Sequence, residues 1–80
     1  MNVKDAVATR FQQICRERKL TLNELAYLSG VTPSTLYSMM DERRRDISIR
    51  TIKKFCDGLD MPLAEFFNDT VFDDLEQEIQ

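Results

Sequence analysis

Histidine and tryptophan are absent from this chain of 80 residues, and cysteine occurs only twice. Without histidine, the usual acid–base and nucleophilic chemistries lose their commonest participant, so we expect no enzyme. Two cysteines supply too few ligands for a zinc site, so we expect no metal. Cys15 and Cys56 fall on the apolar stripes of predicted helices, which favours reduced core thiols; a disulfide or a redox switch is the alternative.

Long apolar runs and flexible stretches are also absent. No segment approaches the roughly 18 apolar residues of a membrane span, and the N-terminus has no apolar signal segment, so we expect no membrane contact and a cytoplasmic location. The chain has two glycines and two prolines, with no glycine-rich phosphate loop, internal repeat or low-complexity linker. Eighty residues, 42% of them hydrophobic, suffice for one domain with a modest core.

Positive charge is missing from the last third of the sequence. The net charge is −3, but all eleven Lys and Arg residues lie within residues 1–54, where six acidic residues leave a charge of +5. Residues 55–80 hold eight acidic residues and no basic one. At physiological salt the Debye length is about 8 Å, so an acidic segment on the far side barely offsets a local basic surface. Two solvated faces of opposite charge are the alternative interpretation.

Apolar residues recur at helical spacing in five segments, and no strand pattern is present. The predicted helices cover Val3–Arg18, a segment after Thr21, Pro33 to about Asp41, a segment after Ser48, and Leu63–Asn68. The expected caps are Asn2, Thr21 (in a capping box with Glu24), Thr32 and Ser48. The expected inward residues include Val3, Ala6, Val7, Phe11, Ile14 and Cys15, then Leu22, Leu25, Ala26 and Leu28, and later Ile49, Ile52, Phe55, Cys56 and Leu59.

The stretch Thr21–Met40 is typical of a helix, a tight turn and a second helix. Gly30 supplies the left-handed backbone conformation that a helix end needs, and Val31 is the apolar plug of the turn. Thr32 caps the next helix, and Pro33 suits its first position. Leu36, Met39 and Met40 face inward in that helix, which leaves Pro33, Ser34, Tyr37 and Ser38 facing outward.

The sequence LTLNELA, followed by SGVT and STLYSMM, resembles the helix-turn-helix of the Cro/cI-type (XRE-like) DNA-binding proteins. The resemblance runs from about Val3 to Phe67 and is most specific at the Leu25-Ala26 pair, four residues before Gly30-Val31. It implies an all-α fold, a compact five-helix lambda-repressor-like DNA-binding domain over residues 1–68. A short acidic C-terminal helix or tail over residues 69–80 would follow. The implied partner is double-stranded DNA, with no cofactor and no small-molecule effector.

The resemblance also implies that the helix beginning at Pro33 lies in the major groove. The candidates for base contact are Pro33, Ser34, Tyr37 and Ser38. Proline cannot donate a hydrogen bond and serine bonds to almost any base, so specificity is expected to depend also on DNA shape and dimer spacing. A plain helix cap is the alternative reading of Thr32-Pro33-Ser34.

Phosphate contacts are expected from the loop and the helix ends. The candidates are Thr32, Thr35, Arg43, Arg44, Arg45, Ser48 and Arg50. In the family, the loop that here holds Arg43–Arg45 lies along the sugar-phosphate backbone, and some relatives reach the minor groove from the position of Arg50. A solvated loop is the alternative. Asp41, Glu42 and Asp46 interrupt the patch, and they either hold the arginines in place or reduce affinity.

Two positions depart from the family pattern. Leu22 replaces a glutamine that in relatives contacts a phosphate, so that anchor is lost. Cys15 and Met40 stand where many relatives pair an arginine with a glutamate. Because both partners of that ion pair are replaced by apolar residues, we predict that Cys15 and Met40 touch.

The C-terminal segment, Thr70–Gln80, carries a narrow apolar stripe: Val71, Phe72, Leu75 and Ile79. It either folds back on its own domain, pairs with a second subunit, or frays or binds another protein. The dimer-interface candidates are Phe66, Phe67, Phe72, Leu75 and Ile79. A homodimer would place two recognition helices on an inverted repeat with half-sites about 34 Å apart.

The function expected from these features is that of a sequence-specific, dimeric DNA-binding transcriptional regulator, most simply a repressor. The alternative is a protein-interaction or antitoxin-type module that uses the same fold with weak DNA affinity. A steep fall of affinity with salt separates the two, because DNA binders release about one counterion per neutralised phosphate.

Overall fold

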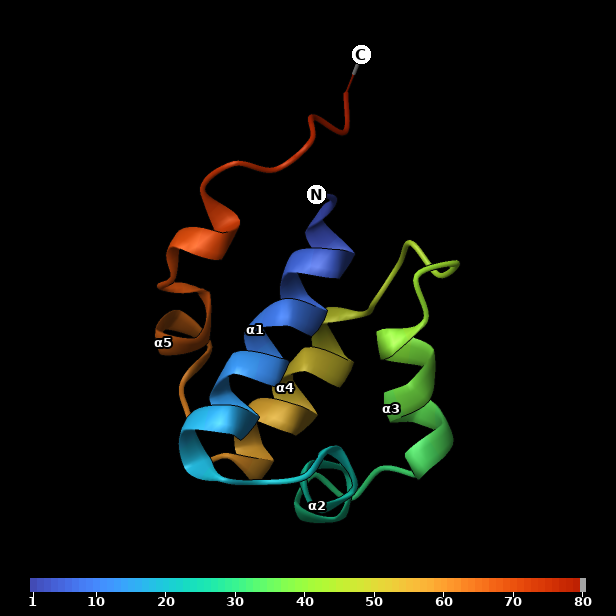
Figure 1. Ribbon diagram of the computed structural model, residues 1–80, viewed down its shortest axis with the longest axis vertical. Helices are drawn as coiled ribbons and strands as arrows, with labels where there is room; N and C mark the ends of the chain where they lie inside the picture. The colour runs from blue at the N-terminus through green and yellow to red at the C-terminus, as the bar shows by residue number, and fades with distance from the viewer. Residues whose placement is uncertain (80) are drawn as a thin grey trace.

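A local cap starts most of the helices in the computed structural model, which describes residues 1–79. The helices are α1 (Val3–Arg18), α2 (Leu22–Leu28), α3 (Pro33–Met40), α4 (Ile49–Gly58) and α5 (Leu63–Phe67), followed by a 3₁₀ turn η1 (Thr70–Phe72) (Figure 1). Within residues 1–79 no strand is formed. The predicted all-α, five-helix fold is therefore confirmed.

Polar side chains form the predicted N-caps. The side-chain oxygens of Asn2, Thr21, Thr32 and Ser48 each accept a hydrogen bond from the backbone amide three residues later. The Thr21–Glu24 capping box is complete. These bonds satisfy amide groups that a helix start leaves without partners, which explains why the boundaries follow from the sequence.

Buried side chains of all five helices form the core, and its centre is aromatic. The ring of Phe11 lies 4.3 Å from that of Phe66 and 5.2 Å from that of Phe55, measured between centroids. All three are fully buried. In Figure 1, α3 and α5 lie on opposite sides of the α1–α4 pair. Leu36 and Met39 of α3 are part of this core, which holds α3 at one edge of the molecule.

Cations of α1 bind the C-terminal ends of three later helices. Lys4 donates to the carbonyl of Asp41 after α3, and Arg18 donates to the carbonyl of Leu59 after α4. Arg10 donates to the carbonyls of Glu65 and Phe66 in α5. Positive charge at a helix C-terminus is favourable because the helix macrodipole and the unpaired carbonyls are negative there.

Three apolar residues predicted to face the core are exposed instead. Val3 is 40% exposed, Leu28 49% and Ile49 60%. Each lies at the first or last position of its helix. Helical periodicity assigns a face but does not say how far along the helix a partner extends.

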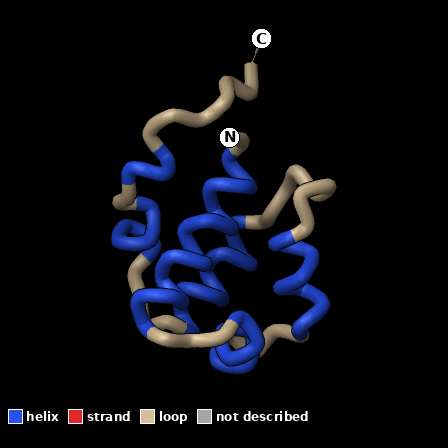
Figure 2. The backbone as a smooth tube through the Cα atoms, viewed as in Figure 1, coloured by secondary structure: helices blue, strands red, loops and turns tan. Residues whose placement is uncertain are grey.

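The C-terminal segment forms no helix beyond the turn η1. Phe72 packs against the core, with its ring centroid 5.0 Å from that of Phe67, so the chain folds back at this point. Residues 73–79 are not helical and lie at the same end of the molecule as the N-terminus (Figure 2). Of the two predicted forms of this segment, a short acidic helix or a tail, residues 73–79 form the tail. A helix would bring the like charges of Asp74 and Glu78 together, and the segment is too short to hold a helix alone. Gln80 lies outside the described residues.

Candidate nucleic-acid interface

The turn between α2 and α3 sets the position of α3. Gly30 has φ +67°, a conformation that disfavours residues with a Cβ. The amide of Val31 then donates to the carbonyl of Ala26 at 3.1 Å, and the Val31 side chain packs against the core. Ala26 is 1% exposed, so a small side chain lies where the two helices meet.

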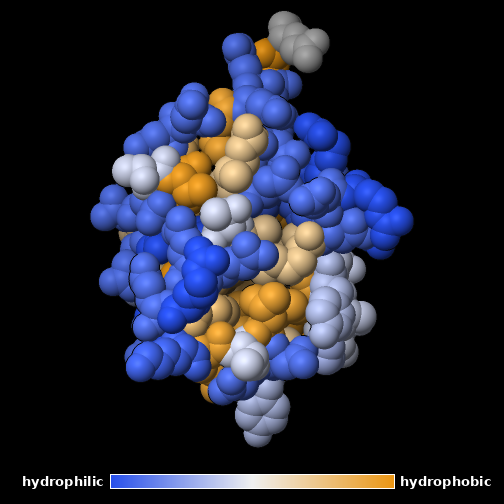
Figure 3. Space-filling view, in the orientation of Figure 1, coloured by the Kyte–Doolittle hydropathy of each residue, from blue (hydrophilic) through white to orange (hydrophobic). Residues whose placement is uncertain are grey.

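The outward face of α3 carries the predicted base-contact residues. Pro33, Ser34, Tyr37 and Ser38 are exposed, whereas Leu36 and Met39 are buried. Figure 3 shows this face as nearly neutral, beside strongly hydrophilic atoms over the loop that follows α3. The helix thus presents small and aromatic groups, and the charge lies next to it.

Two of these outward groups already have partners within the protein. The Ser34 hydroxyl lies 2.9 Å from the hydroxyl of the cap residue Thr32, which also lies 3.2 Å from that of Thr35. The Tyr37 hydroxyl donates to the side-chain carbonyl of Asn23 at 3.4 Å. Of the three residues with a hydroxyl, Ser38 alone has no such side-chain bond within residues 1–79, which leaves its hydroxyl available to a ligand.

The three successive arginines of the loop have different surroundings. Arg43 folds back onto the carboxylate of Asp41, and Arg45 forms an ion pair of 3.7 Å with Glu76 of the C-terminal segment. Arg44 instead lines a hollow between α3 and α4. The run therefore does not act as one uniform basic patch.

The hollow beside Arg44 brings four of the predicted contact residues together. It has a volume of about 180 Å³ and is open to solvent. Its lining contains Thr35 and Ser38 from α3, Arg44 from the loop, and Ser48 and Thr51 from the start of α4, together with Met39, Asp46 and Ile47. One guanidinium and four hydroxyls line this concave surface, and the hydroxyls of Ser48 and Thr51 lie 2.8 Å apart. Guanidinium and hydroxyl groups donate hydrogen bonds to phosphate oxygens.

The remaining phosphate candidates lie at the edges of this surface. Thr32 caps α3, and Arg50 is an exposed residue in the first turn of α4. Leu22, where the family resemblance implied a phosphate-binding glutamine, is half-buried against the core. The structure gives Leu22 a packing role.

The carboxylate of Asp41, next to the interface, has a strongly lowered pKa. Hydrogen bonds from Arg43 lower the pKa of Asp41 from its usual 3.8 to about 2, and the same contact raises the pKa of Arg43. Both groups are therefore charged at neutral pH.

Two buried cations were not singled out from the sequence. Lys4 is 1% exposed and Arg10 is 8% exposed. Lys4 precedes Val7 and Phe11 at helical spacing, and Arg10 lies between Ala6 and Ile14 at intervals of four. Their position on the apolar stripe of α1 was the available signal, since a cation there needs a buried partner.

Phe66, predicted for a dimer interface, is fully buried, and its ring lies on that of Phe11. That prediction is corrected: α5 uses Phe66 for the domain's own core. Of the other candidates, Phe67 is 36% exposed and Ile79 is 79% exposed, while Phe72 and Leu75 are half-buried.

Exposed apolar residues also surround a second hollow, of about 250 Å³. Its apolar lining consists of Val3, Val7, Ile47, Ile49, Ile52 and Phe67. Lys4, Arg45, Asp46 and Glu78 complete it.

Both cysteines are buried free thiols, and burial raises the pKa of Cys15 and raises that of Cys56 to about 11. The sulfur of Met40 accepts a hydrogen bond from the Gln12 amide at 3.3 Å, and Met40 packs against the core that contains Cys15. A direct contact between Cys15 and Met40 stays a prediction. Within residues 1–79 no cluster of metal-ligating side chains occurs. No helix in that range is long and apolar enough to cross a membrane.

An exposed short helix, held against a second helix by a glycine turn, defines a helix-turn-helix protein. A model of the Cro/C1-type HTH DNA-binding domain matches residues 10–71. The chain belongs to this Cro/C1-type helix-turn-helix family, whose members are DNA-binding domains and typically not enzymes.

A solved structure, the crystal structure of the prophage Lp1 protein 11, is similar over nearly the whole chain. The TM-score is 0.82 and the sequence identity 26%, and the match covers 94% of this chain and 100% of that one. No curated protein sequence matches the chain. The family match and this similarity agree with the five-helix architecture.

Proposed function

We propose that the protein is a sequence-specific transcriptional regulator, a dimeric repressor that inserts α3 into the major groove of its operator. The observation that carries the proposal is the hollow in which Thr35, Arg44 and Ser48 converge beside the outward face of α3. A backbone phosphate in this hollow would receive hydrogen bonds from α3, from the loop and from α4 together. That contact would fix the depth of α3 in the groove, because phosphate contacts set register and orientation.

Within this proposal, direct readout of bases falls to Pro33, Ser34, Tyr37 and Ser38. The internal hydrogen bonds of Ser34 and Tyr37 limit their free donors, so Ser38 is the strongest candidate for a polar base contact. Pro33 and Tyr37 offer apolar contact to thymine methyl groups. Arg43, Arg45, Arg50 and Thr32 complete the proposed phosphate contacts.

A second copy of the chain is the proposed partner for the apolar surface around Phe67. Val3, Ile49 and Phe67 are exposed around the second hollow, and Ile79 is exposed at the end of the described chain. Exposed apolar residues gathered around a hollow are typical of interaction surfaces. Dimers would place two copies of α3 on an inverted-repeat operator.

The test is selection from a random duplex library at low salt, followed by binding measurements on the enriched duplex across a range of salt concentrations. We expect an inverted repeat to be enriched. Arg44→Gln should lower the slope of log affinity against log salt by about 1, the amount expected for one lost phosphate contact. Arg16→Gln is the matched control, because Arg16 is an exposed arginine on α1.

An unchanged slope for Arg44→Gln would refute the role given to the hollow. Absence of any enriched duplex would refute the operator proposal. It would favour the protein-interaction module, for which the pairing of Arg43 and Arg45 with acidic groups is the supporting observation.

A further inference from the structure

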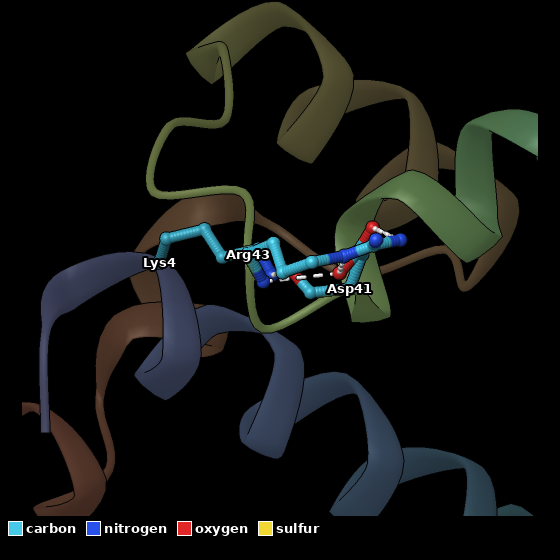
Figure 4. Close-up of polar contacts among 3 residues, drawn as sticks. All are labelled: Lys4, Asp41 and Arg43. Atoms are coloured by element: carbon cyan, nitrogen blue, oxygen red, sulfur yellow. Dashed lines mark hydrogen bonds and ion pairs between the residues drawn. The ribbon is translucent and has the colours of Figure 1, made fainter.

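The C-terminal end of α3 is held in place by a buried cation from another helix. Lys4, in the first turn of α1, is 1% exposed, and its ammonium donates to the backbone carbonyl of Asp41 at 2.5 Å (Figure 4). The backbone amide of Arg44 donates to the same carbonyl at 3.0 Å. Two donors from different segments thus fix the backbone of Asp41 directly after the helix.

The carboxylate of Asp41 in turn holds the side chain of Arg43. One carboxylate oxygen, Oδ1, accepts from the backbone amide of Arg43 at 3.0 Å and from Nε at 3.1 Å. The other, Oδ2, accepts from Nη2 at 3.0 Å. Two parallel bonds between a carboxylate and a guanidinium define the plane and direction of the arginine as well as its position.

The other edge of this guanidinium remains open. A guanidinium has five N–H donors, and two of those in Arg43 bind Asp41. The Arg43 side chain is 90% exposed, so the remaining donors face solvent on the side of the molecule that carries the loop. An arginine held in one orientation loses less rotamer freedom when it binds an anion than a free one does.

We propose that Asp41 is a positioning residue for DNA binding: it orients Arg43 so that the open edge of the guanidinium meets a backbone phosphate, and Lys4 fixes Asp41 for that role. The inference rests on the proposed function, because it takes the phosphate surface of duplex DNA as the ligand. It also assigns a use to an acidic residue inside a basic patch.

Charge alone gives the opposite expectation. Asp41 carries a negative charge beside the proposed phosphate path, so its neutralisation should strengthen DNA binding if the carboxylate only repels DNA or competes with phosphate for Arg43. If Asp41 instead positions Arg43, its neutralisation should weaken DNA binding. Freeing one rotamer-rich side chain corresponds to a loss of about two- to tenfold in affinity. The sign of the change therefore decides between the two accounts.

The experiment measures affinity for the selected duplex by fluorescence anisotropy with full-length Asp41→Asn, Glu42→Gln, Arg43→Gln and the Asp41→Asn/Arg43→Gln double variant. Asp41→Asn retains an oxygen acceptor for the backbone amide of Arg43, so the local turn is kept. The pair of parallel hydrogen bonds between the carboxylate and the guanidinium is lost. Glu42→Gln is the charge-matched control, because it removes an equal charge from the exposed neighbouring residue. Thermal melting of each variant checks that the fold is intact.

We expect Asp41→Asn to weaken binding and Glu42→Gln not to weaken it. In the Arg43→Gln background, Asp41→Asn should produce no further loss, since its effect passes through Arg43. The Arg43 side-chain Nε–H should also show a high heteronuclear NOE in the native protein and a reduced one in Asp41→Asn.

Tighter or equal binding by Asp41→Asn would overturn the proposal while leaving the operator function standing. An equal loss in both backgrounds would overturn it too, because Asp41 would then act independently of Arg43. If the native protein binds no duplex at all, this inference and the proposed function both fail.

Discussion

Replacement of Arg10 by methionine should destabilise the domain strongly, because one guanidinium holds α5 and the chain after it. Nε donates to the carbonyl of Phe66 at 2.8 Å, Nη2 donates to that of Glu65 at 3.2 Å, and Nη1 lies 3.4 Å from the Asp69 carboxylate. The guanidinium carbon lies 6.0 Å from the centroid of the Phe66 ring. Methionine fills similar space but donates none of these bonds.

The magnitude follows from these contacts. A hydrogen bond from a charged donor contributes about 1.5–3 kcal/mol. The two carbonyl bonds are the main loss, and relief of the guanidinium's desolvation offsets part of it. We therefore expect a loss of about 3 kcal/mol, out of a total of about 4–12 kcal/mol for a domain of 80 residues.

The assay is urea denaturation followed by circular dichroism, with a thermal melt as a second measurement. At about 4–8 °C per kcal/mol, the melting temperature should fall by about 12–24 °C. Arg16→Met is the control: Arg16 is exposed on the same helix, so its replacement should change stability by less than about 0.5 kcal/mol. A loss below about 1 kcal/mol for Arg10→Met would refute the reasoning that these bonds hold α5.

Three further predictions concern packing, protonation and thiol reactivity. Gly58→Ala should lower the free energy of unfolding by about 1 kcal/mol, although alanine has the better helix propensity. The alanine Cβ would lie 2.5 Å from the Ser29 hydroxyl and 2.9 Å from backbone atoms of Leu28 and Ser29. An unchanged or higher melting temperature would contradict this prediction. In an NMR titration Asp41 should show a midpoint near pH 2, and its pKa should return toward 3.8 in Arg43→Gln. Because the pKa of Asp41 is lowered in the folded state, its contribution to stability is present above about pH 4 and is lost as the pH falls through 2. Cys15 and Cys56 should resist alkylation at pH 8 in the native protein and react in urea, because burial raises the pKa of both; rapid native labelling of either would place that thiol at the surface.

Features set by short-range chemistry could be predicted from the sequence, and those set by contacts between distant segments could not. The cap residues Thr21, Thr32 and Ser48 act on amides three residues away, so their roles are visible in the sequence itself. By contrast, Lys4 and Arg10 reach carbonyls 37 and 56 residues away, and no local pattern reports such partners.

The candidate interface divides in the same way. The outward face of α3 follows from helical periodicity, and Ser38 and Tyr37 lie where that periodicity places them. The directions of the three arginines do not follow from their sequence. Each depends on a different neighbour: the Asp41 carboxylate, the hollow beside Ser48, and Glu76 of the C-terminal segment.

The cationic bonds of α1 have a consequence for how the domain folds. They join the first helix to the ends of α3, α4 and α5 across 37, 41 and 56 residues of sequence. Contacts of such long range form only when the whole chain has come together, which favours all-or-none unfolding and slows folding relative to a bundle of local hairpins. A fragment containing only α2 and α3 would lack those bonds, so α3 depends for its order on a helix that begins thirty residues before it.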